Sequence, residues 1–323
     1  MKKQLIAAAV AGAFALPAMA QVTLSGSISN GIVNSGASGA KTNVASIGGG
    51  ANALNLTATE DLGGGLSGGF TGQMRFNAST GNFNSNNGAG GDPNGFHAAN
   101  VFLSNKNLGT VRLGKIAEDS NCGFDPWGCL TGAGSLATPG IAGSMLVAAG
   151  TQANSIYLAS PRLQGFGLTF QSTLNRVTED RQVLNLDYSS GPLSAQILRS
   201  QGSAASGTSG NGTTGGTKAE ELALGVSYNL GFARLIYSSI THKNASDVKV
   251  KDIQYVAASI PMGAAAIWAA YSRDDKAVKT ADTSWALGIN YALSKRTSVG
   301  ADMFEREAVG GTTGFALRAR HTF

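Results

Sequence analysis

Hydrophobic and polar residues alternate along most of the chain. From Leu222 to Tyr228, every second residue is large and apolar, and the residues between them are small. The same pattern recurs in residues 165–174, 284–293 and 314–323. A repeat of two residues is typical of β-strands, because successive side chains of a strand point to opposite faces of the sheet. The chain is therefore predicted to be all-β.

Connections of two kinds alternate between these segments. Seven short turns lie at 62–65, 107–109, 161–164, 189–192, 229–231, 261–263 and 293–296. Longer polar or glycine-rich loops lie near 34–51, 78–96, 117–151, 175–180, 201–218, 242–248, 274–281 and 307–313. Seven turns that join strand pairs, with a first and a last strand, predict sixteen strands. Tight turns at one end and long loops at the other are typical of transmembrane barrels, and sixteen strands leave a water-filled channel.

The composition favours a membrane environment. Charged residues make up 13% of the chain, which is about half the usual share, and the 45 glycines are roughly twice the usual number. After residue 20, the sequence has no run of 18 or more apolar residues, so no transmembrane helix is predicted. A closed β-barrel is the other structure that spans a bilayer with all its backbone hydrogen bonds satisfied. We therefore expect a transmembrane antiparallel β-barrel.

Residues 1–20 have the pattern of a secretory signal peptide. A basic start at Lys2 and Lys3 is followed by a small-apolar stretch that ends in Ala-Met-Ala. We expect cleavage after Ala20, and a single mature barrel domain over residues 21–323. Loss of the two lysines lowers the formal net charge from +5 to +3. This mild charge and the absence of a run of five basic residues argue against nucleic-acid binding.

Several stretches of the mature chain form a further pattern. They are QVTLSGSISNGIV (21–33), TEDLGGGLSGGF (59–70), LGTVRLGK (108–115), NSIYLASP (154–161) and YALSKRTSVGA (291–301). Together with the terminal Phe323, they resemble the trimeric general porins of Gram-negative outer membranes, the betaproteobacterial type in particular. The resemblance spans the whole mature chain, and TEDLGGGL and the terminal aromatic residue are its most specific parts.

The resemblance implies a homotrimer in the outer membrane, in contact with its lipid and lipopolysaccharide. It implies passive diffusion of ions and small hydrophilic solutes, with the third long loop folded into the barrel. In the family, acidic residues of this loop face arginines of the wall. The terminal residue, here Phe323, is the signal that the outer-membrane assembly machinery reads. No cofactor is implied.

The chain departs from the family pattern where charges are usual. Family arginines correspond here to Ala53, His97 and Tyr157, and an acidic residue corresponds to Gln73. Strand parity instead places Arg75 and other basic residues on the channel wall, although a solvated position at the rim or at the trimer contact is the alternative. Because fixed charges in a narrow passage select the passing ions, fewer wall arginines predict weak selectivity.

The residues expected at the constriction come from the wall and from the third long loop. They are Gln73, Arg75, His97, Arg112, Lys115, Glu118, Asp119, Asp125, Tyr157, Arg318 and Arg320. Lys115 is expected at the mouth of the loop, and the three acidic residues are expected to supply its negative charge.

The two cysteines of the chain, Cys122 and Cys129, both lie in the third long loop. The Asp-Pro pair between them suits a tight turn, which brings the two thiols within reach of a disulfide in an oxidising compartment. A free thiol pair and a metal site are the alternatives. Such a small ring is expected to add little global stability. Its expected role is to stiffen a tip that presents Phe124, Asp125 and Trp127 to the channel.

Catalytic and metal-binding motifs are absent from the sequence. No histidine lies in a lipase elbow or in an H-E-x-x-H motif, and two cysteines without a nearby histidine supply too few ligands for zinc. His242 is expected to be solvated in a loop. The chain is therefore interpreted as a channel and not as an enzyme. The alternatives are a substrate-selective channel lined by Tyr157, Trp127 and Phe124, and a barrel that mainly displays its loops as an adhesin or phage receptor.

Overall fold

The computed structural model describes most of the chain outside the long loops. The described residues are 21–47, 52–83, 95–117, 120–125, 129–130, 151–174, 181–203, 218–244, 246–275, 282–306 and 312–323. The expected signal peptide therefore lies outside the described residues.

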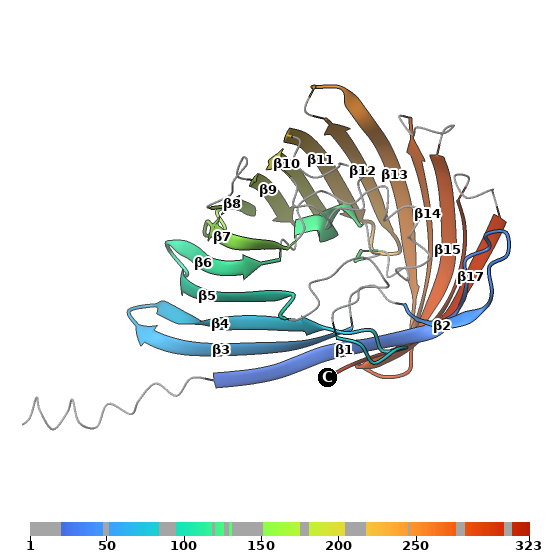
Figure 1. The fold of residues 1–323 in the computed structure, drawn as a ribbon, viewed down its shortest axis with the longest axis horizontal. Coiled ribbons are helices and arrows are strands. Elements are labelled where there is room, and N and C mark those ends of the chain that lie inside the picture. The colour runs from blue at the N-terminus through green and yellow to red at the C-terminus, as the bar shows by residue number, and fades with distance from the viewer. Residues whose placement is uncertain are drawn as a thin grey trace, which may run out of the picture.

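Within the described residues, seventeen strands form one closed antiparallel sheet (Figure 1). The first nine are β1 (Gln21–Asn34), β2 (Asn43–Ser46), β3 (Ala53–Gly63), β4 (Leu66–Arg75), β5 (Ala98–Asn105), β6 (Gly109–Ile116), β7 (Gln152–Ala159), β8 (Phe166–Thr173) and β9 (Gln182–Ser190). The others are β10 (Leu193–Ser203), β11 (Lys218–Asn229), β12 (Arg234–Lys243), β13 (Lys249–Met262), β14 (Ala265–Asp274), β15 (Asp282–Ala292), β16 (Thr297–Arg306) and β17 (Thr312–Thr322). A short 3₁₀-helix, η1 (Ser120–Phe124), follows β6. Among the described residues, no helix is long and apolar enough to cross a membrane.

The barrel closes where the last strand returns to the first. β17 pairs with β1 from Ser27 to Asn34, and the terminal residue extends the ladder. Gly26 N donates to Phe323 O at 3.0 Å, and Phe323 N donates to Gly26 O at 3.1 Å. The phenyl ring of Phe323 covers Gly26, where an added Cβ would lie 2.6 Å from the ring carbon Cζ. The terminal aromatic residue therefore takes part in closing the barrel.

The second position of the barrel is shared by two strands. β2 pairs with the later part of β1 and β3 pairs with its earlier part, so the seventeen strands fill sixteen positions and the predicted strand number is confirmed. The first long connection, expected as a loop over 34–51, contains β2. The Ile47 N–H still donates to Ser29 O at 3.1 Å, and the Ile47 side chain continues the alternation of β2 on the inner face, where it is 1% exposed.

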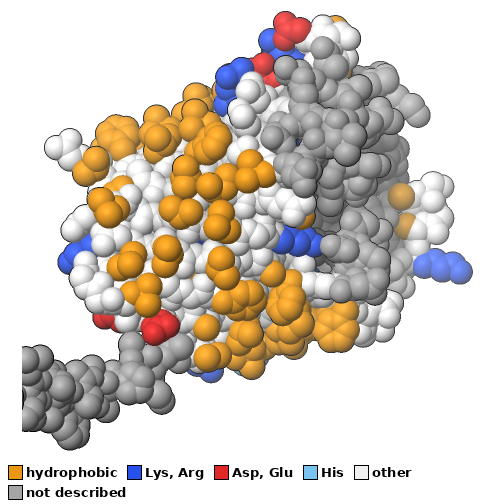
Figure 2. Space-filling model, turned by 60° about the vertical axis from the view of Figure 1, so that its left-hand side comes forward, with side chains coloured by type: hydrophobic (Ala, Val, Ile, Leu, Met, Phe, Trp, Pro, Cys, Tyr) orange, Lys and Arg blue, Asp and Glu red, His pale blue; other side chains and the backbone are white. Residues whose placement is uncertain are grey.

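The two faces of the barrel wall differ as strand parity predicts. On β17, Phe315 and Leu317 are 38% and 51% exposed, whereas Ala316 and Arg318 are 0% and 8% exposed. The same alternation runs along β9 to β16, and apolar side chains cover the outer face, with charged side chains mainly near its edges (Figure 2). At the end with the short turns, Phe166 and Tyr188 stack on the outside with ring centroids 4.6 Å apart. An apolar outer band edged by aromatic residues fits a lipid environment.

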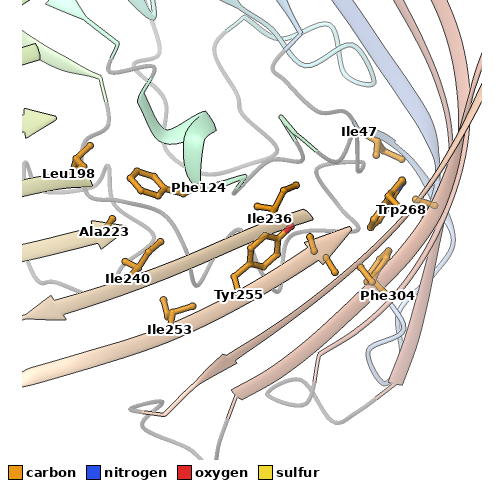
Figure 3. Packing of buried hydrophobic residues seen from close by; sticks show 14 of the residues in the cluster. Ile47, Phe124, Leu198, Ala223, Ile236, Ile240, Ile253, Tyr255, Trp268 and Phe304 are labelled. Atoms are coloured by element: carbon orange, nitrogen blue, oxygen red, sulfur yellow. The ribbon is translucent and has the colours of Figure 1, made fainter. Parts of the chain in front are cut away.

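Part of the inner wall is apolar. Leu198, Ala223, Ile240 and Ile253 form one cross-strand row over β10 to β13, and each of them is at most 1% exposed. Phe124 of η1 belongs to the same cluster (Figure 3). The cluster continues on β14 to β17 with Trp268, Phe304 and Ala316, whereas the described inner wall on β3 to β8 is mostly polar. The interior therefore has an apolar side, which η1 contacts, and a polar side.

Candidate pore constriction

The polar side begins with a chain of side-chain hydrogen bonds on β3 and β4. Gln73 Nε2 donates to Asn55 Oδ1 at 2.9 Å, and Arg75 Nε donates to Gln73 Oε1 at 2.6 Å. The three residues lie at inward-facing positions of their strands, and their neighbours, such as Leu54 and Met74, lie at outward-facing positions. Gln73 thus orients the Arg75 guanidinium on the wall.

His97 extends this group from the residue directly before β5. Its backbone N–H donates to Gln73 O at 2.7 Å, and its Nε2 lies 2.7 Å from Thr151 Oγ1. Burial, as the largest cause, and the positive charges of Arg75 and Lys115 together lower the pKa of His97 to about 3. His97 is therefore neutral at physiological pH, and it does not replace the charge of the family arginine.

Arg112 and Tyr157 form the next inward-facing pair. They are direct partners in the register of β6 and β7, and the Arg112 guanidinium carbon lies 5.2 Å from the centroid of the Tyr157 ring. This is a cation–π geometry, which holds the guanidinium along the wall.

The strand register shows which residues lie opposite the positions where the chain departs from the family pattern. Ala53 is the direct partner of Arg75, and Tyr157 is the direct partner of Arg112. Two of the three positions where an expected arginine is missing thus have an arginine opposite them on the adjacent strand. Sequence comparison along one strand does not reveal this, because the exchange is between strands.

Arg318 is an inward-facing residue with a structural partner. Its Nε donates to Asp302 Oδ2 at 2.9 Å and its Nη2 donates to Asp302 Oδ1 at 3.2 Å. The two side chains are 6% and 0% exposed, and Arg318 also donates to Asn290. Glycine makes room for both, since an added Cβ at Gly300 would lie 2.8 Å from Arg318 Cζ. Because the two charges of this buried pair nearly cancel, the pair adds little to the electric field in the channel. Arg318 differs in this respect from the other expected wall charges.

The remaining expected wall residues are placed as follows. Arg320 lies two residues after Arg318 on the same inward parity of β17, opposite Ser29, and it is partly buried. Lys115 lies on β6 next to its end at Ile116, opposite Ala99. Glu118, Asp119 and Trp127 lie outside the described residues.

The part of the third long loop that is described contacts the apolar side of the interior. Phe124 and Asp125 are both 0% exposed, and Figure 1 shows η1, in green, within the ring of strands. Asp125 Oδ2 accepts a hydrogen bond from Tyr255 Oη at 2.8 Å, and Ser238 Oγ donates to Phe124 O at 3.2 Å. The expectation that the tip presents Phe124 and Asp125 to the channel was wrong. The phenyl ring of Phe124 packs into the inner wall, and the carboxylate of Asp125, the next residue, is buried there with it.

Cys122 and Cys129 form a disulfide, with their Cα atoms 5.3 Å apart. Within the ring, Asp125 N donates to Cys122 O at 3.1 Å, which is the hydrogen bond of a tight turn. Asp125 Oδ1 also accepts from Leu130 N at 2.6 Å. The disulfide and this carboxylate therefore join the same two arms of the loop.

Replacing both cysteines by serine should leave the barrel folded but loosen this loop. The ladder of the wall does not pass through the ring, so the amount of folded barrel in heat-modifiability gels should stay unchanged. We expect greater open-channel current noise and closure at lower voltage, measured in planar bilayers. Noise and gating equal to the wild type would contradict a stiffening role. Wild-type protein treated with a reductant should reproduce the effect of the double variant.

One buried polar group was placed wrongly from the sequence. His242, expected in a solvated loop, lies in β12 and is 5% exposed, with its Nε2 3.9 Å from Glu221 Oε1. β12 extends to Lys243, and inward parity turns the ring to the interior. The repeat of two residues along β12, which puts His242 on the same face as Ile240, was the available signal. Among the described residues, no group of three or more His, Cys, Asp or Glu side chains is placed to hold a metal ion.

A closed antiparallel barrel with an apolar outer face and a charged, polar inner side is the architecture of a transmembrane channel. A sequence model described as Gram-negative porin matches residues 7–307. Outer membrane porin protein 32 of Delftia acidovorans is 29% identical over 324 residues, which cover 93% of this chain and 88% of that protein.

Solved structures share the fold. An anion-selective porin from Comamonas acidovorans has a TM-score of 0.73 at 24% identity, over 94% of this chain and all 100% of that chain. OmpF of Salmonella typhi, in a complex with daunomycin, has a TM-score of 0.71 at 12% identity, over 94% of this chain and 98% of that chain. The chain belongs to the Gram-negative porin family, which consists of outer-membrane channels for passive diffusion and not of enzymes.

Proposed function

We propose that the channel passes ions and small hydrophilic solutes with a modest preference for anions, and that it is narrowest between the third long loop and the wall of β4 to β7. The observation that carries this proposal is the position of Arg75 and Arg112 directly opposite Ala53 and Tyr157. Positive charge remains on this wall, one strand away from its usual place. The similar Comamonas acidovorans porin is described as anion-selective.

The preference is modest because part of the inner charge is compensated. Asp302 pairs with Arg318, and His97 is neutral at physiological pH. Fixed charges concentrate counter-ions in a narrow passage only when they are not cancelled by a nearby opposite charge. We therefore still expect weak selectivity. The reason is now the compensation of inner charges and not the absence of the family arginines.

The assembly of the channel follows from the same resemblance. We propose cleavage after Ala20, a homotrimer in contact with outer-membrane lipid and lipopolysaccharide, and recognition of Phe323 by the assembly machinery. The exposure of the terminal residue supports the last of these, since Phe323 is 39% exposed at the seam, where a binding partner reaches it.

An aromatic-lined, substrate-selective constriction receives less support. Of its three expected residues, Phe124 is fully buried in the inner wall, and Tyr157 is covered by Arg112. The proposed general channel therefore explains more of the described interior.

Conductance in planar bilayers tests the proposal. Purified protein should give stepwise, non-saturating conductance, and a salt gradient should give a reversal potential of the sign of an anion-preferring channel. A cation preference, saturable block by one solute, or no conductance at all would each contradict it.

A further inference from the structure

We propose that Tyr255 is the positioning residue that holds the disulfide ring of the third long loop against the inner wall, and so sets how far this loop extends into the passage. The proposal rests on the channel function above and deepens it. Tyr255 lies on β13 and is 0% exposed. No pattern in the sequence singled it out.

The ring contacts one cross-strand row of the wall. Gln196, Gly225, Ser238 and Tyr255 are successive register partners on β10, β11, β12 and β13. Gln196 and Gly225 face the backbone of Gly123. Ser238 donates to the Phe124 carbonyl and Tyr255 donates to the Asp125 carboxylate. Three successive residues of the ring segment thus contact four successive positions of the wall. These four wall residues form a continuous binding surface for the ring, which is called the seat below.

The seat brings two backbones close together. A Cβ added to Gly225 would lie 2.5 Å from Gly123 O and 2.8 Å from Phe124 Cδ1. Only a residue without a side chain allows η1 to approach β11 to this distance. The phenyl ring of Phe124 then packs into the apolar row beside this one, which includes Leu198 and Ala223.

Tyr255 supplies a hydrogen-bond donor to the buried carboxylate of Asp125. Its inward neighbours on β13, Ile253 and Ala257, are apolar. A carboxylate buried among such residues is costly unless donors meet it. The donors to Asp125 include Tyr255 Oη of the wall and Leu130 N of the other arm of the ring. The carboxylate thereby links the closed ring to β13.

Tyr255→Phe removes this donor while keeping the aromatic ring. Loss of one hydrogen bond to a charged group should raise the ratio of detached to seated loop by roughly tenfold or more. In planar bilayers, the variant should show increased open-channel noise and new conductance substates. Tyr237→Phe is the matched control, because Tyr237 lies on the outer face of β12, is 40% exposed and donates to Gln254. Its noise should equal that of the wild type.

Hydrogen exchange provides a second readout that does not depend on conductance. In the seated state, the Asp125 carboxylate accepts a hydrogen bond from the backbone N–H of Leu130. Detachment of the ring exposes this N–H to solvent. Exchange over residues 120–130 should be about tenfold faster in Tyr255→Phe than in Tyr237→Phe, because exchange follows the population of the open state. Gly225→Ala unseats the ring by crowding instead of by loss of a donor, and it should reproduce both effects if Tyr255→Phe does not fold.

The results separate this inference from the proposed function. If the wild type conducts and Tyr255→Phe, or Gly225→Ala in its place, matches it in noise and exchange, Tyr255 does not position the loop. If the wild type does not conduct, the channel function fails, and the exchange rates still decide whether Tyr255 holds the ring.

Discussion

Asp302→Ala should destabilise the barrel by about 3–5 kcal/mol, the cost of leaving one partner of a buried ion pair without the other. Arg318 and Asp302 are 6% and 0% exposed and are joined by two hydrogen bonds. Without the carboxylate, the guanidinium stays in a low-dielectric environment over Gly300. The effect should appear as a lower urea midpoint in lipid vesicles, and as a lower temperature of unfolding on heat-modifiability gels.

An exposed ion pair supplies the control. Lys243 and Asp247 lie 2.9 Å apart, with the Asp247 side chain 79% exposed, so Asp247→Ala should leave the urea midpoint nearly unchanged. The double variant Arg318→Met, Asp302→Leu should recover much of the loss, because it removes both charges together. Equal midpoints for Asp302→Ala and Asp247→Ala would show that the Arg318–Asp302 pair is not buried in the folded barrel.

Replacement of Arg75 and Arg112 by alanine should reduce the preference for anions. At about 6 Å in water, one arginine charge and one passing ion interact by about 0.7 kcal/mol. This attracts an anion by about threefold and repels a cation by a similar factor, before salt screens it. For the double variant, we expect the permeability ratio of anions to cations to fall by roughly threefold to tenfold, as measured by the reversal potential in a KCl gradient.

A charge on the outer face tests whether position matters. Arg199 pairs with Glu220 at 3.1 Å and lies on the outward parity of β10, with 53% of its side chain exposed. Arg199→Ala should leave the reversal potential unchanged. The difference between the two variants should shrink in 1 M salt, where the screening length is about 3 Å. If the double variant keeps the wild-type permeability ratio of anions to cations, Arg75 and Arg112 do not lie at the constriction.

Most of the barrel was predictable because its signal is local. Alternation along β11, β15 and β17 follows from a repeat of two residues, and glycine-rich turns separate the strands. The sheet has the sixteen positions expected from counting these turns. β2 was missed because four residues, Asn43–Ser46, are too few to show alternation.

The candidate site was predictable only in part. Parity correctly separates the inward Arg75 and Arg112 from their outward neighbours, because facing is a property of one strand. It does not show what lies opposite. Asp125 was read as a charge for the channel, but it bonds to Tyr255, 130 residues away. Apolar residues on both faces of β10, β12 and β13 were the local sign that something packs inside.

The amino-acid order alone thus establishes the all-β class, the strand number, the facing of side chains along the strands with clear alternation and the position of the cysteine pair, since each depends on neighbours a few residues apart. The tertiary structure decides which charges act on the channel. Asp302 compensates Arg318 from the adjacent strand, Arg75 stands opposite Ala53, and Tyr255 binds the carboxylate of the ring. The physical reason is that the energy of a charge depends on its burial and its nearest partner, and both are set by the register between strands and by the packing of the loop inside the barrel.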